Sequence, residues 1–358
     1  MKRAIARPEP PEPGPGHGSN AAGEPYRGRM DATVELSRAA RRLRSELADD
    51  GVVIDADPRL VAIILDELGY ARRPPQFERR VPVYGSMVVP DDRSLVAVGD
   101  LVDLVPVDDQ PLPIARRFAD GRSSFLTIHP DGRRHLALFR RAVLFESDLV
   151  EIQADTGAYI IQRTPVLEAT RVFTGARTIE WSGYKWSARP NAQTQFEKLR
   201  PYLPHIAPPV LAGMLQFAIH WLSPGRVGAT LVVPVSHGGD GLDMDNGTAI
   251  PRLSITARHH YAPLLAALTQ TDLAAVLDGK GWVHHIGVGL NSSPEADASV
   301  ATNRGMRHRS AARYTYDHPE SVAVVVSEDG PVTVFHQGRP LSQCAASLGM
   351  DMSSAAAS

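Results

Sequence analysis

The pattern of apolar and polar positions changes early in the chain, from two helical stretches to a series of short strands. Apolar residues recur at helical spacing from Thr33 to Leu47, and a second helix is predicted after Asp57-Pro58, where a capping aspartate precedes a proline. Turn signals such as Pro130-Asp131-Gly132 then separate runs typical of strands. These runs are Val81–Val89, Ser94–Val107, Phe125–His129, His135–Phe139, Ala158–Gln162 and Arg171–Trp181. The pattern predicts a small β-rich α+β domain over residues 30–186.

From Val210 onward the pattern alternates between helices and strands. The predicted order is a helix at Val210–Leu222, a strand at Val227–Val235, a helix at His260–Gln270, strands at Asp272–Leu277 and Trp282–Leu290, a helix from Met306 and a buried strand at Val322–Ser327. Alternation of this kind is typical of an α/β domain with a covered, mixed sheet. We therefore predict a second domain of this class over residues 210–344.

Three further segments differ from these two domains in composition. Residues 1–29 are rich in Pro, Gly and Glu, and residues 345–358 are small and polar, so both ends are predicted to be disordered. Residues 187–209 are punctuated by prolines and are predicted to be a linker between the domains.

Composition excludes some classes of function. With 38 Lys and Arg against 40 Asp and Glu, the chain lacks the basic excess typical of a nucleic-acid-binding surface. No apolar run approaches the roughly 18 residues that span a bilayer, and Met1-Lys2-Arg3 leads into prolines rather than the apolar core of a signal peptide. The only cysteine, Cys344, cannot form an internal disulfide. We expect a cytoplasmic protein with no nucleic-acid or membrane partner.

Several motifs of the second domain are weak alone but informative in their order. By itself, Arg307-His308-Arg309 has the composition of an exposed basic turn. It lies, however, within a series of segments: Gly228–Val233, Thr271–Leu277, Trp282–Leu290, Gly305–Ala312, Ser327–Gly330 and Val332–Phe335. In this order and spacing, over about Val210 to Leu341, the segments resemble the diadenylate cyclase family. Gly305–Ala312 is similar to the family's Gly-Thr-Arg-His-Arg-x-Ala, Ser327–Gly330 to its Ser-Glu-Glu-x-Gly, and Asp272 takes the place of the aspartate in its Asp-Gly-Ala motif.

The resemblance implies the diadenylate cyclase fold and an enzyme that condenses two ATP molecules into cyclic di-AMP and two pyrophosphates. It implies these catalytic residues: Asp272, Arg307, His308 and Arg309. It implies these substrate-binding residues: Leu273, Ala274, Leu290, Gly305, Met306, Ser310 and Ser327. Asp272 and Glu328, with Asp329 as a further candidate, would bind Mg²⁺ or Mn²⁺ through oxygen ligands. Family catalysis brings two sites face to face, so a homodimer or higher homo-oligomer is expected.

The residue chemistry agrees with these roles. A carboxylate beside a divalent metal can polarise the ribose 3′-OH, and Asp272 is predicted to lie at the start of a strand where it could do so. If Asp272 is not that residue, Asp278 is the next candidate. Arginines at the start of a helix offer charge and free backbone N–H groups to a triphosphate.

Two departures from the family motifs leave a second function open. Leu273 replaces the glycine after the aspartate, and Met306 replaces the threonine before Arg-His-Arg. The alternative is a degenerate cyclase fold that binds ATP or cyclic di-AMP as a sensor without turnover. The first domain carries no catalytic motif and is predicted to be sensor-like and to regulate the cyclase; a scaffolding role for it is compatible with either function.

Overall fold

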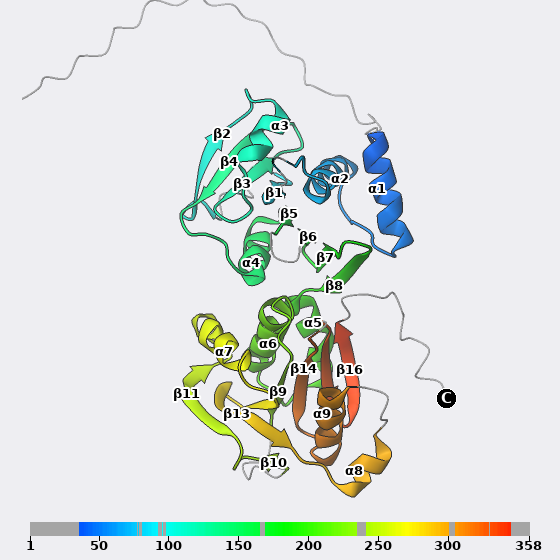
Figure 1. The fold of residues 1–358 in the computed structure, drawn as a ribbon, viewed down its shortest axis with the longest axis vertical. Coiled ribbons are helices and arrows are strands. Elements are labelled where there is room, and N and C mark those ends of the chain that lie inside the picture. Colours follow the sequence, from blue (N-terminus) through cyan, green and yellow to red (C-terminus); the bar gives the residue numbers. More distant parts are fainter. Residues whose placement is uncertain are drawn as a thin grey trace, which may run out of the picture. The chain divides into compact units, whose positions relative to one another are not determined.

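Two β-sheets, one in each half of the chain, organise the structure (Figure 1). The computed structural model describes residues 36–344 except 77, 79–80, 92–94, 96–97, 165–168, 235–240, 301–304 and 329. The two ends predicted to be disordered, 1–29 and 345–358, lie outside the described residues, as does Asp329. Residues from Leu36 onward group into one compact unit.

The first sheet has eight strands in the order β2-β4-β3-β1-β5-β6-β7-β8. Neighbouring strands are antiparallel except β1 and β3, which are parallel. The strands are β1 (Tyr84–Val88), β2 (Val102–Pro106), β3 (Ser124–Ile128), β4 (Arg134–Phe139), β5 (Tyr159–Arg163), β6 (Thr170–Phe173), β7 (Arg177–Trp181) and β8 (Trp186–Pro190). Every predicted run overlaps one of these strands, and the run Arg171–Trp181 overlaps two, so the β-rich α+β prediction is confirmed.

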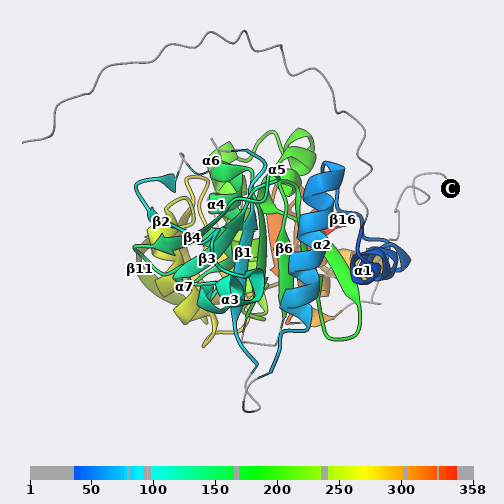
Figure 2. The same cartoon turned by 90° about the horizontal axis from the view of Figure 1, so that it is seen from above.

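Helices cover this sheet. They are α1 (Arg38–Asp49), α2 (Pro58–Arg72), α3 (Leu112–Ala115), a 3₁₀ turn (Arg116–Phe118) and α4 (Glu146–Thr156). As predicted, Asp57 caps α2, its side chain accepting a hydrogen bond from the Arg59 N–H at 2.9 Å, with Pro58 in the first turn. The apolar face of α2 packs on β1, β5 and β6 (Figure 2). The periodicity of the sequence did not predict α4, whose buried face carries Glu146, Ser147 and Gln153 beside its apolar residues.

The segment predicted as a linker, 187–209, is structured instead. It contains most of β8, helix α5 (Ala192–Leu199) and a 3₁₀ turn (Arg200–Tyr202). Asn191 caps α5 by accepting a hydrogen bond from the Thr194 N–H at 2.8 Å. Leu199 and Leu203 are buried in the core of the second sheet. The structure corrects the linker prediction because these apolar residues pack against segments distant in sequence.

The second sheet has the order β10-β13-β12-β9-β14-β15-β16, and β11 also pairs with β13. Only β9 and β12 are parallel neighbours, so the sheet is mixed as predicted. The strands are β9 (Ala229–Val233), β10 (Leu242–Asp243), β11 (Thr248–Ser254), β12 (Ala274–Leu277), β13 (Trp282–Leu290), β14 (Val322–Val326), β15 (Val332–His336) and β16 (Arg339–Cys344). β12 begins two residues later than predicted, which leaves Asp272 and Leu273 just before the strand.

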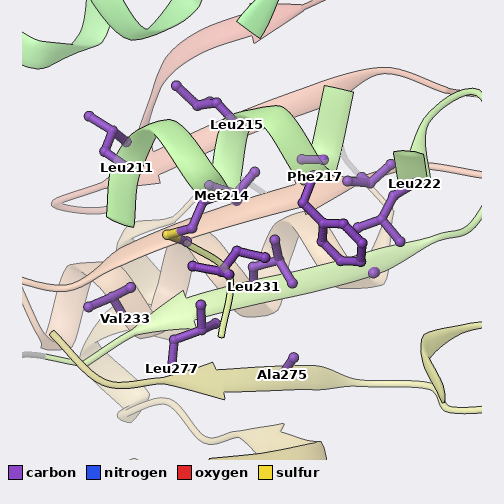
Figure 3. Close-up of a cluster of buried hydrophobic side chains, with 14 of the residues drawn as sticks. Leu211, Met214, Leu215, Phe217, Leu222, Leu231, Val233, Ala275 and Leu277 are labelled. Carbon is purple, nitrogen blue, oxygen red and sulfur yellow. The ribbon is translucent and has the colours of Figure 1, made fainter. Parts of the chain in front are cut away.

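Helices flank both faces of this sheet. They are α6 (Pro208–Phe217), continued by a π-helical turn (Ala218–Leu222), a 3₁₀ turn (Arg258–His260), α7 (Tyr261–Leu268), α8 (Pro294–Ser299) and α9 (Met306–Asp317). On one face, Met214 and Phe217 of α6 lie over Leu231 of β9 (Figure 3). The next strand residue, Val232, belongs to a separate buried cluster with Ala311 of α9. This alternation follows from the two-residue period of a strand and confirms the covered α/β domain.

Among the described residues, no helix is both long and apolar enough to cross a membrane.

Candidate functional site

A cavity of about 330 Å³ lies at one end of the second sheet. The strand directions bring this site together: β9 and β12 begin here, while β13 and β14, antiparallel to them, end here. The N-terminus of α9 completes the lining. The lining residues are Thr230, Asp272, Leu273, Ala274, Val288, Leu290, Gly305, Met306, Arg307, His308, Ser310, Val326, Ser327 and Glu328. Residues from five separate segments of the sequence therefore face one space.

Arg307 joins the two carboxylates of the cavity. Its Nη2 donates to Asp272 Oδ1 at 2.8 Å and its Nη1 donates to Glu328 Oε1 at 3.0 Å. Burial alone would lower the pKa of Arg307, but the hydrogen bonds to Glu328 and Asp272 outweigh it and raise the pKa. The guanidinium is thus a permanent cation held between two acids.

Asp272 is an exposed carboxylate at the mouth of the cavity, with 73% of its side-chain surface accessible. Its Oδ1 also accepts a hydrogen bond from the Leu273 N–H at 2.8 Å. This backbone hydrogen bond, followed by the hydrogen bond from Arg307, lowers the pKa of Asp272. The side chain is therefore ionised at neutral pH and acts as an acceptor.

Leu273 has a backbone conformation that favours glycine, with φ of +69°. Its side chain is half exposed and lines the cavity. A side chain in this left-handed region costs roughly 1 kcal/mol. The backbone conformation is thus the one that a glycine would adopt without strain, although the residue is leucine.

Gly228 is a residue of the site that the sequence did not single out. It precedes β9, and a Cβ atom there would lie 2.5 Å from Arg307 Nη1 and 2.9 Å from Glu328 Cγ. The close approach of the Arg307 guanidinium to this backbone therefore requires glycine. Because the two segments are distant in sequence, only the structure reveals the requirement.

The other predicted site residues divide into two groups. His308 lies in the lining, where its Nε2 is 3.2 Å from Thr333 Oγ1 and its ring packs edge-on against Phe335. The predicted substrate-binding residues also line the cavity: Leu273, Ala274, Leu290, Gly305, Met306, Ser310 and Ser327. Arg309, predicted to be catalytic, does not belong to the lining. Asp278 does not either, since its Oδ1 accepts from the Lys280 and Trp282 N–H groups in the β12–β13 turn.

Asp272 and Glu328 have the oxygen chemistry that a divalent cation requires. Asp272 and Glu328 each use one oxygen for Arg307; among the described residues, Asp272 Oδ2 and Glu328 Oε2 have no hydrogen-bond partner. Mg²⁺ in proteins is commonly held by one or two carboxylates together with substrate phosphates. No group of three or more His, Cys, Asp or Glu side chains able to hold a metal exists in the described part of the chain. A cation here would need further oxygen ligands besides these two carboxylates.

Fold and site together define an α/β domain with a charged cavity at one end of a mixed sheet. Residues 216–340 match the family described as "DisA bacterial checkpoint controller nucleotide-binding", and residues 41–189 match the family described as "Probable sensor domain DACNK". Two family models thus match the chain in succession, a probable sensor domain and then a nucleotide-binding domain of the DisA (DAC) family. The sequence motifs predicted the second domain, and a sensor-like domain was predicted before it.

The other comparisons add no functional information. No curated protein matches the chain. Among solved structures, a hypothetical membrane spanning protein from Bacillus cereus is similar at 19% identity with a TM-score of 0.29, over 43% of this chain and 79% of that chain. A double mutant of DacA from Staphylococcus aureus is similar at 17% identity with a TM-score of 0.24, over 43% of this chain and 87% of that chain.

Proposed function

We propose that the protein condenses two ATP molecules into cyclic di-AMP and two pyrophosphates. The observation that carries the proposal is the contact of Arg307 with both Asp272 and Glu328 inside a cavity of the matched nucleotide-binding domain. This arrangement supports the proposal because it brings one cation and two carboxylate side chains together in a single cavity.

The triphosphate is proposed to lie at the N-terminus of α9. Gly305, the N-cap residue, offers no side chain to the first backbone N–H groups of the helix, so those groups remain for an anion. The Arg307 guanidinium can donate two parallel hydrogen bonds to a phosphate, and the hydroxyl groups of Ser310 and Ser327 in the same lining can donate further ones. The apolar residue Leu290 supplies a surface for the adenine ring.

Asp272 is proposed to orient and polarise the ribose 3′-OH. The lowered pKa of Asp272 makes the carboxylate a weak base. Its proposed role is therefore to accept a hydrogen bond from the 3′-OH in its ionised form rather than to remove the proton. Asp272 and Glu328 would hold Mg²⁺ or Mn²⁺, which supplies charge neutralisation to the phosphates and the leaving pyrophosphate. In each half-reaction the 3′ oxygen of one ATP bonds to the α-phosphorus of the other, the bond from that phosphorus to pyrophosphate breaks, and the hydroxyl proton passes to solvent.

Two protomers are proposed to meet for this reaction, since the product contains two nucleotides and the chain matches one nucleotide-binding domain. The lining includes two large apolar side chains that are exposed to solvent in the single chain, Leu273 at 50% and Met306 at 74%. Facing cavities of two protomers would cover these side chains and bring each 3′-OH to the other nucleotide.

The test is incubation of the full-length protein with ATP and either Mn²⁺ or Mg²⁺, over a series of protein concentrations, with products identified by mass. We expect cyclic di-AMP, with a rate per protomer that rises with protein concentration. If the protein binds ATP but forms no cyclic or linear dinucleotide with either metal, the proposed cyclase activity is excluded.

The second candidate function is a nucleotide sensor without turnover. The backbone of Leu273 favours it, because a leucine in a left-handed conformation lines the cavity where the family has glycine. If the wild-type protein binds ATP but makes no product, the variant combining Leu273→Gly with Met306→Thr is expected to gain cyclase activity. A variant that stays inactive despite binding ATP would show that these two residues are not the cause.

A further inference from the structure

A second polar cavity, of about 390 Å³, lies where the two sheets approach each other. One wall is formed by strands of the first sheet, with Arg171 on β6 and Arg189 on β8. The opposite wall is formed by two turns of the second half of the chain, Ser223–Arg226 and Gly330-Pro331. We call this space the junction cavity.

A buried acid holds two of the arginines of the junction cavity in place. Glu146 of α4 contacts Arg189 and lies 3.3 Å from Arg171 Nη1. Arg171 also contacts Glu180 on β7, with Nε 3.2 Å from Oε2. Arg189 further donates from Nη1 to the backbone oxygen of Ile219 at 3.2 Å. The charges of Arg171 and Arg189 are therefore balanced by Glu146 and Glu180.

Two further cations of the junction cavity have no such partner. Lys185, in the β7–β8 turn, and Arg226 form no ion pair with any carboxylate in the described ranges. Among the described residues, the cavity and its wall thus hold four cations (Arg171, Arg189, Lys185 and Arg226) and two acids (Glu146 and Glu180), an excess of two positive charges. A local excess of positive charge in a cleft attracts a small anion.

Arg226 also has a strained backbone, with φ of +54°. The turn that holds it closes with the Arg226 N–H donating to the Ser223 oxygen at 3.0 Å and follows the π-helical turn directly. A non-glycine residue in a left-handed conformation costs roughly 1 kcal/mol, and strain of this kind clusters at active sites, ligand clamps and switch regions.

The junction cavity shares a turn with the cavity lined by Asp272, Arg307 and Glu328, which we call the nucleotide cavity. Ser223 Oγ donates to the Gly330 oxygen at 2.5 Å, and Gly330 N–H donates to the Ser327 oxygen at 2.8 Å. Ser327 and Glu328, at the other end of this turn, line the nucleotide cavity. A ligand in the junction cavity would therefore contact the turn that positions Glu328 against Arg307.

We propose that the junction cavity binds a small ligand carrying a phosphate group, held by Lys185 and Arg226. A phosphate dianion matches both the charge excess and the space. The site is distinct from the nucleotide cavity, and its occupancy does not depend on catalytic turnover. Through the Ser327–Gly330 turn, its occupancy would also change the affinity of the nucleotide cavity for ATP.

Inorganic phosphate is the probe for this site, titrated calorimetrically into the full-length protein at constant ionic strength. The variant combines Lys185→Gln with Arg226→Asn, because asparagine tolerates a positive φ and the fold should persist. Loss of two charge-assisted hydrogen bonds should weaken phosphate binding about tenfold or more. Lys280→Gln, which removes an exposed charge in the β12–β13 turn, is the matched control and should bind phosphate as the wild type does.

Arg307→Gln separates the two cavities in the same titration. Saturable phosphate binding that survives in Arg307→Gln and is lost in the Lys185–Arg226 variant supports the proposal. Equal binding by the wild type and the Lys185–Arg226 variant, loss of all binding in Arg307→Gln, or no saturable binding in the wild type would each overturn it. None of these outcomes depends on whether the protein makes cyclic di-AMP.

Discussion

Arg307 forms hydrogen bonds with both carboxylates of the nucleotide cavity. Its two terminal nitrogens contact Asp272 and Glu328, which lie 35 and 21 residues from Arg307 along the chain. Substitution of either acid therefore tests a distinct part of the site, one acid beside β12 and the other after β14.

Asp272→Asn keeps the shape and the hydrogen bond but removes the charge. We expect cyclase activity to fall by about 10²–10⁴-fold, the range typical for loss of one acid–base contribution, while ATP still binds. Activity is measured as cyclic di-AMP formed per protomer. Asp278→Asn is the matched control and should keep its activity, because that carboxylate caps a turn outside the cavity; the opposite ranking of the two variants would move the catalytic role to Asp278.

Gly228→Ala tests the close approach of Arg307. The added Cβ would lie 2.5 Å from Nη1, so the guanidinium must move away from the carboxylates. We expect activity to fall at least about tenfold, the equivalent of one hydrogen bond to a charged group, with little change in the melting temperature. Gly279→Ala is the control, since its Cβ would meet no atom within 4 Å. Equal activity of both variants would show that the position of Arg307 does not matter.

At the scale of elements, α5 connects the two sheets and depends on its first turn. Asn191 Oδ1 accepts from the Thr194 N–H at 2.8 Å, and Asn191 Nδ2 donates to the Gly175 oxygen at 2.8 Å. The residue is buried. One side chain thus caps the helix and ties it to the β6–β7 turn.

Asn191→Ala is expected to lower the free energy of unfolding by about 1–2 kcal/mol, because the cap and a buried hydrogen bond are both lost. Urea-induced unfolding provides the measurement. Asn191→Asp keeps the acceptor for Thr194 and should recover part of the loss. An alanine variant as stable as the wild type would mean that α5 does not depend on its cap.

At the scale of the whole molecule, a buried polar cluster links α4 to the π-helical turn. His220 Nε2 accepts from the Ala192 N–H at 3.1 Å, so its Nδ1 carries the proton and donates to Glu146 at 2.8 Å. Burial lowers the pKa of His220, and the hydrogen bond to Glu146 only partly opposes it. Burial would raise the pKa of Glu146, but Arg189, His220 and Arg171 outweigh it and lower the pKa.

Both shifts make the molecule less stable in acid. Each group has a folded pKa below its unfolded value, so its contribution is complete above that value and is lost as the pH falls through the folded pKa. The free energy of unfolding should decrease as the pH falls below about 6.5, the usual value for histidine, and further below the usual 4.5 of glutamate. Urea unfolding at a series of pH values measures this.

His220→Gln provides the variant for this pH series. Glutamine can accept from Ala192 and donate to Glu146 without titrating, so the loss of stability between pH 7 and the range where Glu146 titrates should shrink. His284→Gln, at an exposed position, is the control and should follow the wild type. A histidine variant with the pH dependence of the wild type would show that His220 does not titrate on unfolding.

The sequence by itself determined several of the local elements and predicted which residues would line one cavity. Asp57-Pro58 predicted the start of α2, the valine run predicted β14, and the motif order predicted that Asp272, Arg307 and Glu328 would share one site. These features depend on periodicity, capping and residue type, which act over a few neighbours along the chain.

Only the tertiary structure decided what depends on contacts between distant segments. It converted the predicted linker into β8 and α5, left Arg309 outside the cavity lining, and made Gly228 obligatory beside Arg307. It also buried Glu146 with Arg189 and His220, although nothing in α4 marks an acid for burial. The physical reason is that burial, close approach and the pairing of buried charges are set by partners that the fold brings together, not by the residues adjacent in sequence.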